Sequence, residues 1–239
     1  MEMINNRIVV AIVSCVFVFS SSQIMAQGTV YTFMAGPTMS TQTVNGFEKD
    51  PFIRFHAIAQ MESTSEISPN ALYARLGYHV KGSAVNSRAY YDPSTGASYS
   101  GESQSIEFHN LSATVGAKQR REVGNNFLSY GFGIRGDFNL STKYDPIFIG
   151  LAGTENNFTY GLDIDIGFEF PLSELVSTTI EFGFSPDLGE QIYIPLQDTG
   201  YQYPDGSGQT VIIPESSIKN IVFEVRAGFR FWRKVIYVD

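Results

Sequence analysis

Apolar and polar side chains alternate without a break between residues 158 and 170. The even positions are large and apolar: Phe158, Tyr160, Leu162, Ile164, Ile166, Phe168 and Phe170. The odd positions are polar or glycine: Thr159, Gly161, Asp163, Asp165, Gly167 and Glu169. A period of two residues predicts an extended strand with two opposite faces. Ordinary strands have about 5–6 residues, whereas a tilted strand that crosses a bilayer needs about 9–11. This stretch is therefore predicted to span a membrane.

The same alternation recurs along the chain and predicts further strands. They lie near residues 29–39, 51–61, 71–81, 103–119, 128–140, 176–184 and 221–231. The connections after the second, fourth and sixth strands are short, and the other connections are longer. Bacterial outer-membrane barrels have this asymmetry, with tight turns on the periplasmic side and long loops outside. We therefore expect an all-β fold, an eight-stranded antiparallel up-and-down transmembrane β-barrel.

The phase of the alternation changes once, inside the strand at 103–119. Ile106 and Phe108 occupy even positions, whereas the later apolar residues of this strand, beginning with Leu111, occupy odd positions. One extra residue near His109 or Asn110, a β-bulge, would return all of these apolar side chains to one face.

The first residues have the pattern of a secretory signal peptide. Ile8 to Phe19 form an apolar run of the right length for the central region of such a peptide, and too short for a spanning helix. Ala26 is the expected last residue before cleavage. Residues 1–26 are thus predicted as a signal peptide and residues 27–239 as the barrel domain. The only cysteine is Cys15. A lipoprotein acylation site there is the alternative, but the apolar run continues past it.

Composition narrows the choice of partners. The net charge of −8 and the pI near 4.9 argue against nucleic acid as a partner. The mean hydropathy of −0.05 is usual for soluble proteins, but a transmembrane barrel gives the same value because only alternate residues face lipid.

Alternation alone does not say which face points inward. A soluble lipocalin-like barrel that binds a small hydrophobic ligand, or a β-sandwich, would bury the apolar face. Three features favour the inverse arrangement: the long strands, the 14% aromatic content with aromatics at strand ends, and a polar face that mixes glycine with both charge signs. We therefore expect the apolar face to contact lipid.

Eight strands leave an interior just wide enough for side chains, so the charged residues of the polar face must share one lumen. Unpaired buried charges are costly, and a matched network of ion pairs is expected. The predicted members are Arg54, Arg75, Arg135, Asp137, Asp163, Asp165, Glu169, Glu181, Glu224, Arg226 and Arg230. His56 and His79 are expected to form hydrogen bonds in the same lumen.

Two segments carry a family resemblance: LYARLGYHVKG at residues 72–82 and VRAGFRF at residues 225–231. With them, the chain from Thr29 to the last strand resembles the eight-stranded outer-membrane barrels of the OmpA/OmpX type, and especially the PorT-like outer-membrane β-barrel family. The resemblance implies insertion by the barrel assembly machinery and an accessory role in protein secretion. Family members commonly end on an aromatic residue, whereas here Tyr237 is followed by Val238 and Asp239.

Three patterns are candidates for catalytic or ligand sites. Gly131, Gly133 and Gly136 match G-x-G-x-x-G, but the helix that a dinucleotide site requires is not predicted after them. Asp163 and Asp165, about 7 Å apart on one strand face, could hold a cation, but a charge-paired lumen explains them better. His109 near Ser112 is the best candidate pair for a lipid hydrolase, although no G-x-S-x-G or H-E-x-x-H motif occurs.

Two of the predicted outer loops are rich in tyrosine, which offers a large amphipathic contact area at low entropic cost. The tyrosines are Tyr90, Tyr91, Tyr99, Tyr193, Tyr201 and Tyr203. An aromatic rim at the lipid interface is the alternative explanation.

The preferred interpretation is a non-enzymatic integral outer-membrane protein, without a cofactor or metal, surrounded by outer-membrane lipid. Its outer loops would serve a structural role or bind an envelope or extracellular protein. A lipid-modifying hydrolase, a small diffusion pore and a soluble ligand-binding barrel remain as alternatives.

Overall fold

The computed structural model describes residues 28–43, 50–64, 69–86, 90–92, 96–99, 101, 103–202, 210–213 and 215–234. The predicted signal peptide and Tyr203 lie outside these segments. No helix in the described part of the chain is long and apolar enough to cross a membrane.

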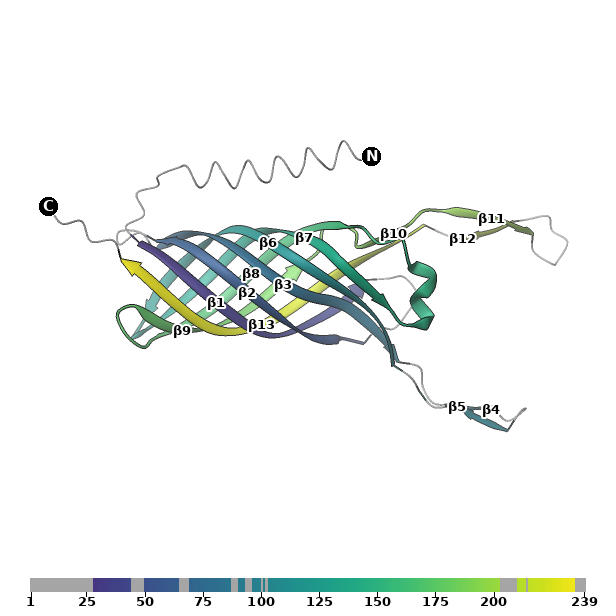
Figure 1. Ribbon diagram of the computed structural model, residues 1–239, viewed down its shortest axis with the longest axis horizontal. Coiled ribbons are helices and arrows are strands. Elements are labelled where there is room, and N and C mark those ends of the chain that lie inside the picture. The colour runs from purple at the N-terminus through teal and green to yellow at the C-terminus, as the bar shows by residue number, and fades with distance from the viewer. Residues whose placement is uncertain are drawn as a thin grey trace.

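Eight long strands pair in chain order and close into a ring (Figure 1). They are β1 (Gly28–Thr43), β2 (Phe52–Thr64), β3 (Asn70–Asn86), β6 (Ser103–Val123), β7 (Asn126–Tyr144), β8 (Phe158–Pro171), β9 (Val176–Pro186) and β13 (Ser216–Lys234). Each neighbouring pair is antiparallel, and β13 pairs with β1 to complete the barrel. The predicted eight-stranded up-and-down barrel is confirmed.

Smaller elements lie beyond one end of the barrel (Figure 1). The short strand β10 (Ile192–Ile194) pairs with the start of β13. β4 (Tyr90–Asp92) and β5 (Ala97–Tyr99) form one hairpin, β11 (Gln197–Gln202) and β12 (Thr210–Ile213) pair as a second, and η1 (Pro146–Leu151) is a short 3-10 helix. These elements belong to the long connections, which all leave the barrel at this end.

The opposite end carries the tight turns, together with the start of β1 and the end of β13. Gly124 turns the chain between β6 and β7 with a φ of 63°, a left-handed conformation that glycine adopts without strain. Between β8 and β9, the N–H groups of Leu172 and Ser173 both donate to the carbonyl oxygen of Val176, at 2.9 and 3.0 Å. By the asymmetry of outer-membrane barrels, this tight-turn end is periplasmic and the long-loop end is extracellular.

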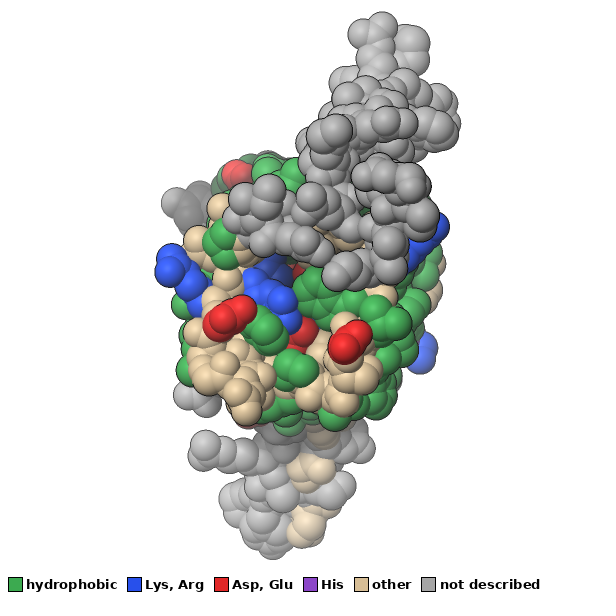
Figure 2. Space-filling model, turned by 90° about the vertical axis from the view of Figure 1, so that its left-hand side faces the viewer, with side chains coloured by type: hydrophobic (Ala, Val, Ile, Leu, Met, Phe, Trp, Pro, Cys, Tyr) green, Lys and Arg blue, Asp and Glu red, His purple; other side chains and the backbone are tan. Residues whose placement is uncertain are grey.

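The two strand faces have opposite environments. Outward side chains are apolar and exposed, as at Phe33 (57%) and Ile134 (66%), whereas inward charged side chains such as Arg135 (1%) and Glu181 (0%) are fully buried. Figure 2 views the tight-turn end, where Lys and Arg side chains gather near the middle with an acidic side chain beside them. A soluble barrel has the inverse arrangement, so the predicted apolar outer face is confirmed.

The register shift predicted near His109 and Asn110 is present, but its consequence differs from the prediction. His109 pairs with Ser141 and Asn110 pairs with Asn139, so the extra residue, Leu140, lies in β7 rather than in β6. The expectation that Ile106 and Phe108 share the outer apolar face is wrong. Both point inward and are 1% and 0% exposed, because they pack into an apolar cluster at the extracellular end.

Candidate functional site

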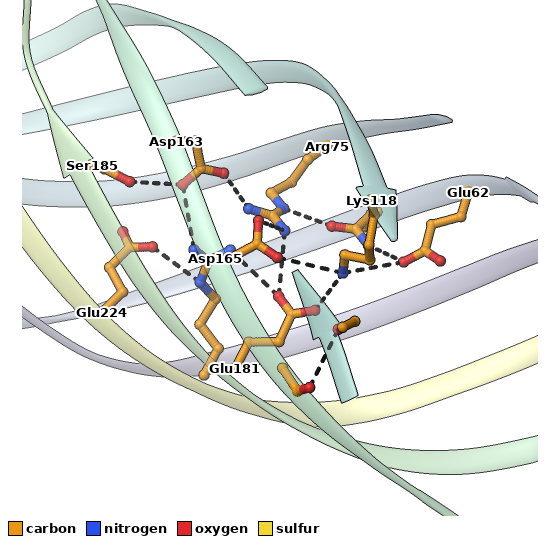
Figure 3. A network of polar contacts seen from close by, with 12 residues as sticks. Glu62, Arg75, Lys118, Asp163, Asp165, Glu181, Ser185 and Glu224 are labelled. Carbon is orange, nitrogen blue, oxygen red and sulfur yellow. Dashed lines mark hydrogen bonds and ion pairs between the residues drawn. The ribbon is translucent and has the colours of Figure 1, made fainter. Parts of the chain in front are cut away.

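Ion pairs fill the middle of the lumen (Figure 3). Arg75 of β3 contacts the carboxylate of Asp163, and its Nη2 lies 3.5 Å from Asp165 and 3.3 Å from Glu181. Arg226 of β13 reaches the same acids from the other side, at 3.5 Å from Asp163 and 3.7 Å from Glu181. Two strands that are far apart in the barrel sheet, β3 and β13, are thereby joined through acids on β8 and β9.

Glycines on the inward face make room for these large side chains. A Cβ atom on Gly183 would lie 2.1 Å from Nη2 of Arg226, and one on Gly131 would lie 2.5 Å from Oδ2 of Asp165. Gly131 and Gly133 of the G-x-G-x-x-G match therefore belong to a barrel strand that faces a packed lumen, with no helix directly after them.

The network continues to the periplasmic end. Lys118 lies 2.6 Å from Glu181 and 3.4 Å from Glu62, and Arg230 lies 2.7 Å from Glu62. Arg120 closes this end with two hydrogen bonds to Glu169, at 2.8 and 3.0 Å. Its guanidinium also lies 3.4 Å from the ring centroid of Phe127 and 4.7 Å from that of Trp232.

Towards the extracellular end, the predicted luminal histidines lie side by side. The rings of His56 and His79 stack with centroids 5.4 Å apart, and Nδ1 of His79 lies 2.5 Å from Glu224. A further group of paired charges lies next to them on the extracellular side. Arg135 lies 2.9 Å from Asp137, Lys81 lies 3.1 Å from Asp187, and Lys81 also contacts Asp137.

An apolar cluster lies on the extracellular side of the paired charges around Lys81 and Asp137. Ile106, Phe108, Ile192 and Ile218 form its buried centre, and Tyr144, Phe148, Leu151 and Ile194 pack against it. Glu155 fastens the neighbouring loop by accepting hydrogen bonds from the Tyr144 hydroxyl and the Gly153 N–H, both at 2.7 Å. Burial raises the pKa of Glu155, but these hydrogen bonds outweigh burial and hold the pKa below its usual value. The lumen is thus closed by apolar packing at one end and by Arg120 at the other.

The charges of the described lumen nearly balance. Its eight carboxylates belong to Glu62, Asp137, Asp163, Asp165, Glu169, Glu181, Asp187 and Glu224. Its seven Lys and Arg side chains belong to Arg75, Lys81, Lys118, Arg120, Arg135, Arg226 and Arg230. Each carboxylate lies within ion-pair distance of at least one of these cations. This near balance of opposite charges is what makes burial of so many charged groups tolerable.

One predicted member of the network, Arg54, is not in the lumen. Its side chain is 43% exposed, stacks 3.9 Å above the ring of Phe52, and pairs at 2.5 Å with Glu107 on the outer face of β6. The regular β2–β3 pairing ends at His56 and His79, and Phe52 then packs against β3 in a cluster with Val80 and Ala84. The alternation of apolar and polar residues gives no sign that the Arg54 side chain points outward. The other ten predicted residues all line the lumen.

Five charged residues of the lumen are not in the predicted set. Lys81 and Lys118 occupy polar positions of alternating strands, so the pattern contained the signal to find them. Glu62 and Arg120 lie just past the predicted ends of the strands at 51–61 and 103–119, whereas β2 continues to Thr64 and β6 to Val123. Asp187 lies beyond the predicted strand end at residue 184, although it has the odd parity of the inward residues of β9, such as Glu181 and Ser185.

The tyrosine-rich loops are described only in part. Tyr90 and Tyr99 are paired residues of the β4–β5 hairpin, which also contains Tyr91. Tyr193 is exposed, and its hydroxyl donates a 3.0 Å hydrogen bond to Glu215. Hydrogen bonding to this carboxylate raises the pKa of Tyr193. Tyr201 lies in β11.

His109 and Ser112 point to opposite sides of β6 and do not form a hydrolase pair. Ser112 faces the lumen, where its hydroxyl donates to the Gly77 carbonyl oxygen at 3.2 Å. His109 faces outward, with Nδ1 2.5 Å from the Tyr78 hydroxyl and Nε2 3.5 Å from Glu107. In the described segments, no group of three or more His, Cys, Asp or Glu side chains is arranged to hold a metal ion.

A closed ring of long strands, an apolar outer face and a paired charged lumen define the class of protein: it is an integral outer-membrane β-barrel. No family model matches the chain, and no curated protein matches it. Its fold is similar to that of three solved outer-membrane proteins. The outer membrane protein OprG from Pseudomonas aeruginosa is 8% identical over 87% of this chain and 96% of its own, with a TM-score of 0.48. Neisserial surface protein A is 11% identical over 87% and 97%, with a TM-score of 0.42. The outer membrane protease OmpT from Escherichia coli is 8% identical over 87% and 97%, with a TM-score of 0.43.

Proposed function

We propose that this protein is a non-enzymatic, non-conducting outer-membrane barrel whose extracellular segments bind an envelope or extracellular protein. The closed lumen is the single observation that carries this proposal. A barrel whose interior is occupied leaves the outer face and the loops as its working surfaces.

The geometry of the lumen argues against a diffusion pore. A conducting path would have to pass Arg120, which is held between two aromatic rings and Glu169, and then the ion pairs around Arg75. It would finally have to cross the apolar cluster around Phe108. Opening any of these places separates buried charges or exposes apolar side chains to water, and both are costly.

The extracellular segments are attached to the barrel sheet and to the buried apolar cluster. β10 extends the barrel sheet beyond the membrane through its pairing with β13, and its first residue, Ile192, belongs to the buried apolar cluster. Tyr193 is the next residue of β10 after Ile192, and its side chain faces solvent. An exposed aromatic side chain on a rigid strand binds with little loss of conformational entropy, as recognition surfaces require.

A lipid hydrolase is less well supported. The nucleophile of such an enzyme needs a free nitrogen on its histidine base. Both ring nitrogens of His109 already face other side chains, Tyr78 and Glu107, and Ser112 lies on the opposite face. The resemblance to PorT-like barrels adds a more specific proposal, that the bound partner belongs to a protein secretion system and that the barrel assembly machinery inserts the chain.

Cross-linking in intact outer membranes tests this proposal. The test variant replaces residues 197–213, which include β11 and β12, with a short turn and keeps residues 187–194, because Asp187 and Ile192 help to close the barrel. The matched control shortens residues 90–99, the β4–β5 hairpin. We expect a cross-linked species that is lost in the variant with residues 197–213 replaced and kept in the control. Both variants should show the heat-modifiable band of a folded barrel. Steady single-channel conductance of the wild-type protein in planar bilayers would refute the proposal.

A further inference from the structure

A polar cluster lies on the outer face of the barrel, where most side chains are apolar. Arg54 of β2 pairs with Glu107 of β6 at 2.5 Å, and Glu107 lies 3.5 Å from Nε2 of His109. Tyr78 of β3 completes the cluster, with its hydroxyl 2.5 Å from Nδ1 of His109. None of these groups takes part in the luminal network.

Lys143 adds a second full positive charge to this outer cluster. It is exposed and stands directly opposite Glu107 in the antiparallel pairing of β6 and β7. Side chains opposite each other in such a pair have Cβ atoms about 4.5–5.5 Å apart. Arg54 and Lys143 therefore flank one carboxylate, and the cluster has an excess of positive charge even with His109 neutral.

The position of the cluster along the strands is also informative. On β6, the outward residues on the periplasmic side of His109 are the apolar series Leu111, Ala113, Val115 and Ala117. His109 and Glu107 follow this series directly on the extracellular side. The cluster therefore marks the edge of the apolar band, the depth at which the head groups of the outer leaflet begin.

We propose that this outer cluster binds a phosphate group carried on the head group of an outer-leaflet lipid. Arginine is suited to phosphate because its planar fork of N–H donors matches two phosphate oxygens. Arg54 donates through Nη2 to Glu107 and through Nη1 to the Ile53 carbonyl oxygen at 3.0 Å. Its side chain is 43% exposed, and Nε and one hydrogen on each of Nη1 and Nη2 remain for a ligand. Glu107 orients the guanidinium, the stacking on Phe52 supports it from below, and Lys143 supplies a second cation.

The neighbouring surface fits the rest of a lipid molecule. Ile53 and Phe55, on either side of Arg54, are 62% and 60% exposed and offer apolar contact to an acyl chain. A protein partner is a poorer fit, because these residues lie at membrane depth. The inference depends on the location in the outer membrane but not on the proposed partner of the loops.

Native mass spectrometry of the purified barrel tests this site with diphosphorylated lipid A as the probe. A cation close to an anionic lipid surface contributes about fivefold to binding, so R54Q or K143Q should each lower the retained lipid about fivefold and the double variant about 25-fold. R121Q is the matched control, because Arg121 is an exposed cation at the periplasmic end of β6, the strand that carries Glu107 and His109. It should retain lipid as the wild type does.

Two further arms identify the source of the phosphate. Dephosphorylated lipid A should bind the wild type as weakly as diphosphorylated lipid A binds the double variant, and millimolar inorganic phosphate should not displace the lipid. Equal retention of both lipid forms, or equal retention by wild type and R54Q/K143Q, overturns the proposal. Displacement by inorganic phosphate also overturns it, in favour of a free-phosphate site. A heat-modifiable band confirms that each variant is folded.

Discussion

The central test of the paired lumen is the removal of one charge at its centre, by Glu181→Gln. Glu181 lies 2.6 Å from Lys118, 3.3 Å from Arg75 and 3.7 Å from Arg226. At an effective dielectric constant of about 20, unit charges at these separations attract by about 6, 5 and 4 kcal/mol. The cost of burying the carboxylate offsets much of this sum.

The net effect follows from what the substitution leaves behind. The amide of glutamine keeps the shape of the side chain, but three buried cations lose a shared counter-charge. Breaking a buried ion pair by removing one partner costs about 3–5 kcal/mol, and we expect this loss in the free energy of unfolding. Lys118→Met should also destabilise the barrel. The double variant should lose less than the sum of the two single losses, because the two residues interact directly.

Urea unfolding of the barrel in lipid vesicles provides the measurement. The protein has a single tryptophan, Trp232, whose fluorescence reports on the periplasmic end, and the heat-modifiable gel band reports on the whole barrel. Thr179→Val is a suitable control, since Thr179 is buried on the same face of β9 and carries no charge. A loss of less than about 1 kcal/mol for Glu181→Gln, or strict additivity with Lys118→Met, would refute the ion-paired lumen.

Three further predictions concern the ends of the barrel and its packing. Gly183→Ala should destabilise the barrel by about 1–3 kcal/mol in urea unfolding, because its Cβ would displace Arg226, whereas Gly150→Ala, which has open space around its Cβ, should not. Arg120→Ala should loosen the periplasmic closure, seen as faster quenching of Trp232 fluorescence by acrylamide. Unchanged quenching would contradict the proposed closure. Glu155 has a lowered pKa, so its stabilising effect is present above its unfolded value of 4.5 and is lost as the pH falls below that value. Proteolysis of the loop at 145–157 with an acid-active protease should therefore rise below pH 4.5 in the wild type. Glu155→Gln should be equally sensitive on both sides of that pH, and a wild-type profile identical to that of the variant would contradict this prediction.

Much of the architecture could be predicted from local patterns. A strict period of two, as between Phe158 and Phe170, requires an extended chain and assigns each side chain to one of two faces. The strand lengths and the alternation of short and long connections then indicate a membrane barrel. Ten of the eleven predicted luminal charges were identified in this way, because a residue's face in a regular strand depends only on its position along that strand.

The predictions failed where the pairing between strands becomes irregular. Arg54 has the parity of an inward residue but lies outside, because β2 leaves its regular pairing with β3 beyond His56. Ile106 and Phe108 have the composition of lipid-facing residues but point inward, because the extra residue of the bulge lies in β7. Parity along β2 contains no information about the change at Arg54. For Ile106 and Phe108, in contrast, the unbroken parity of β6 points inward, and only their apolar character suggests the outer face.

Taken alone, the sequence determined the number of strands, their two faces, and the apolar and charged character of each face, since these are properties of neighbouring residues in one strand. Only the tertiary structure decided which charges meet, where the lumen closes, and which polar residues lie outside. The contacts of Lys118 with Glu181 and of Arg230 with Glu62 join residues that are 63 and 168 positions apart. Such contacts depend on strand register and on closure of the ring, which are set jointly by all eight strands.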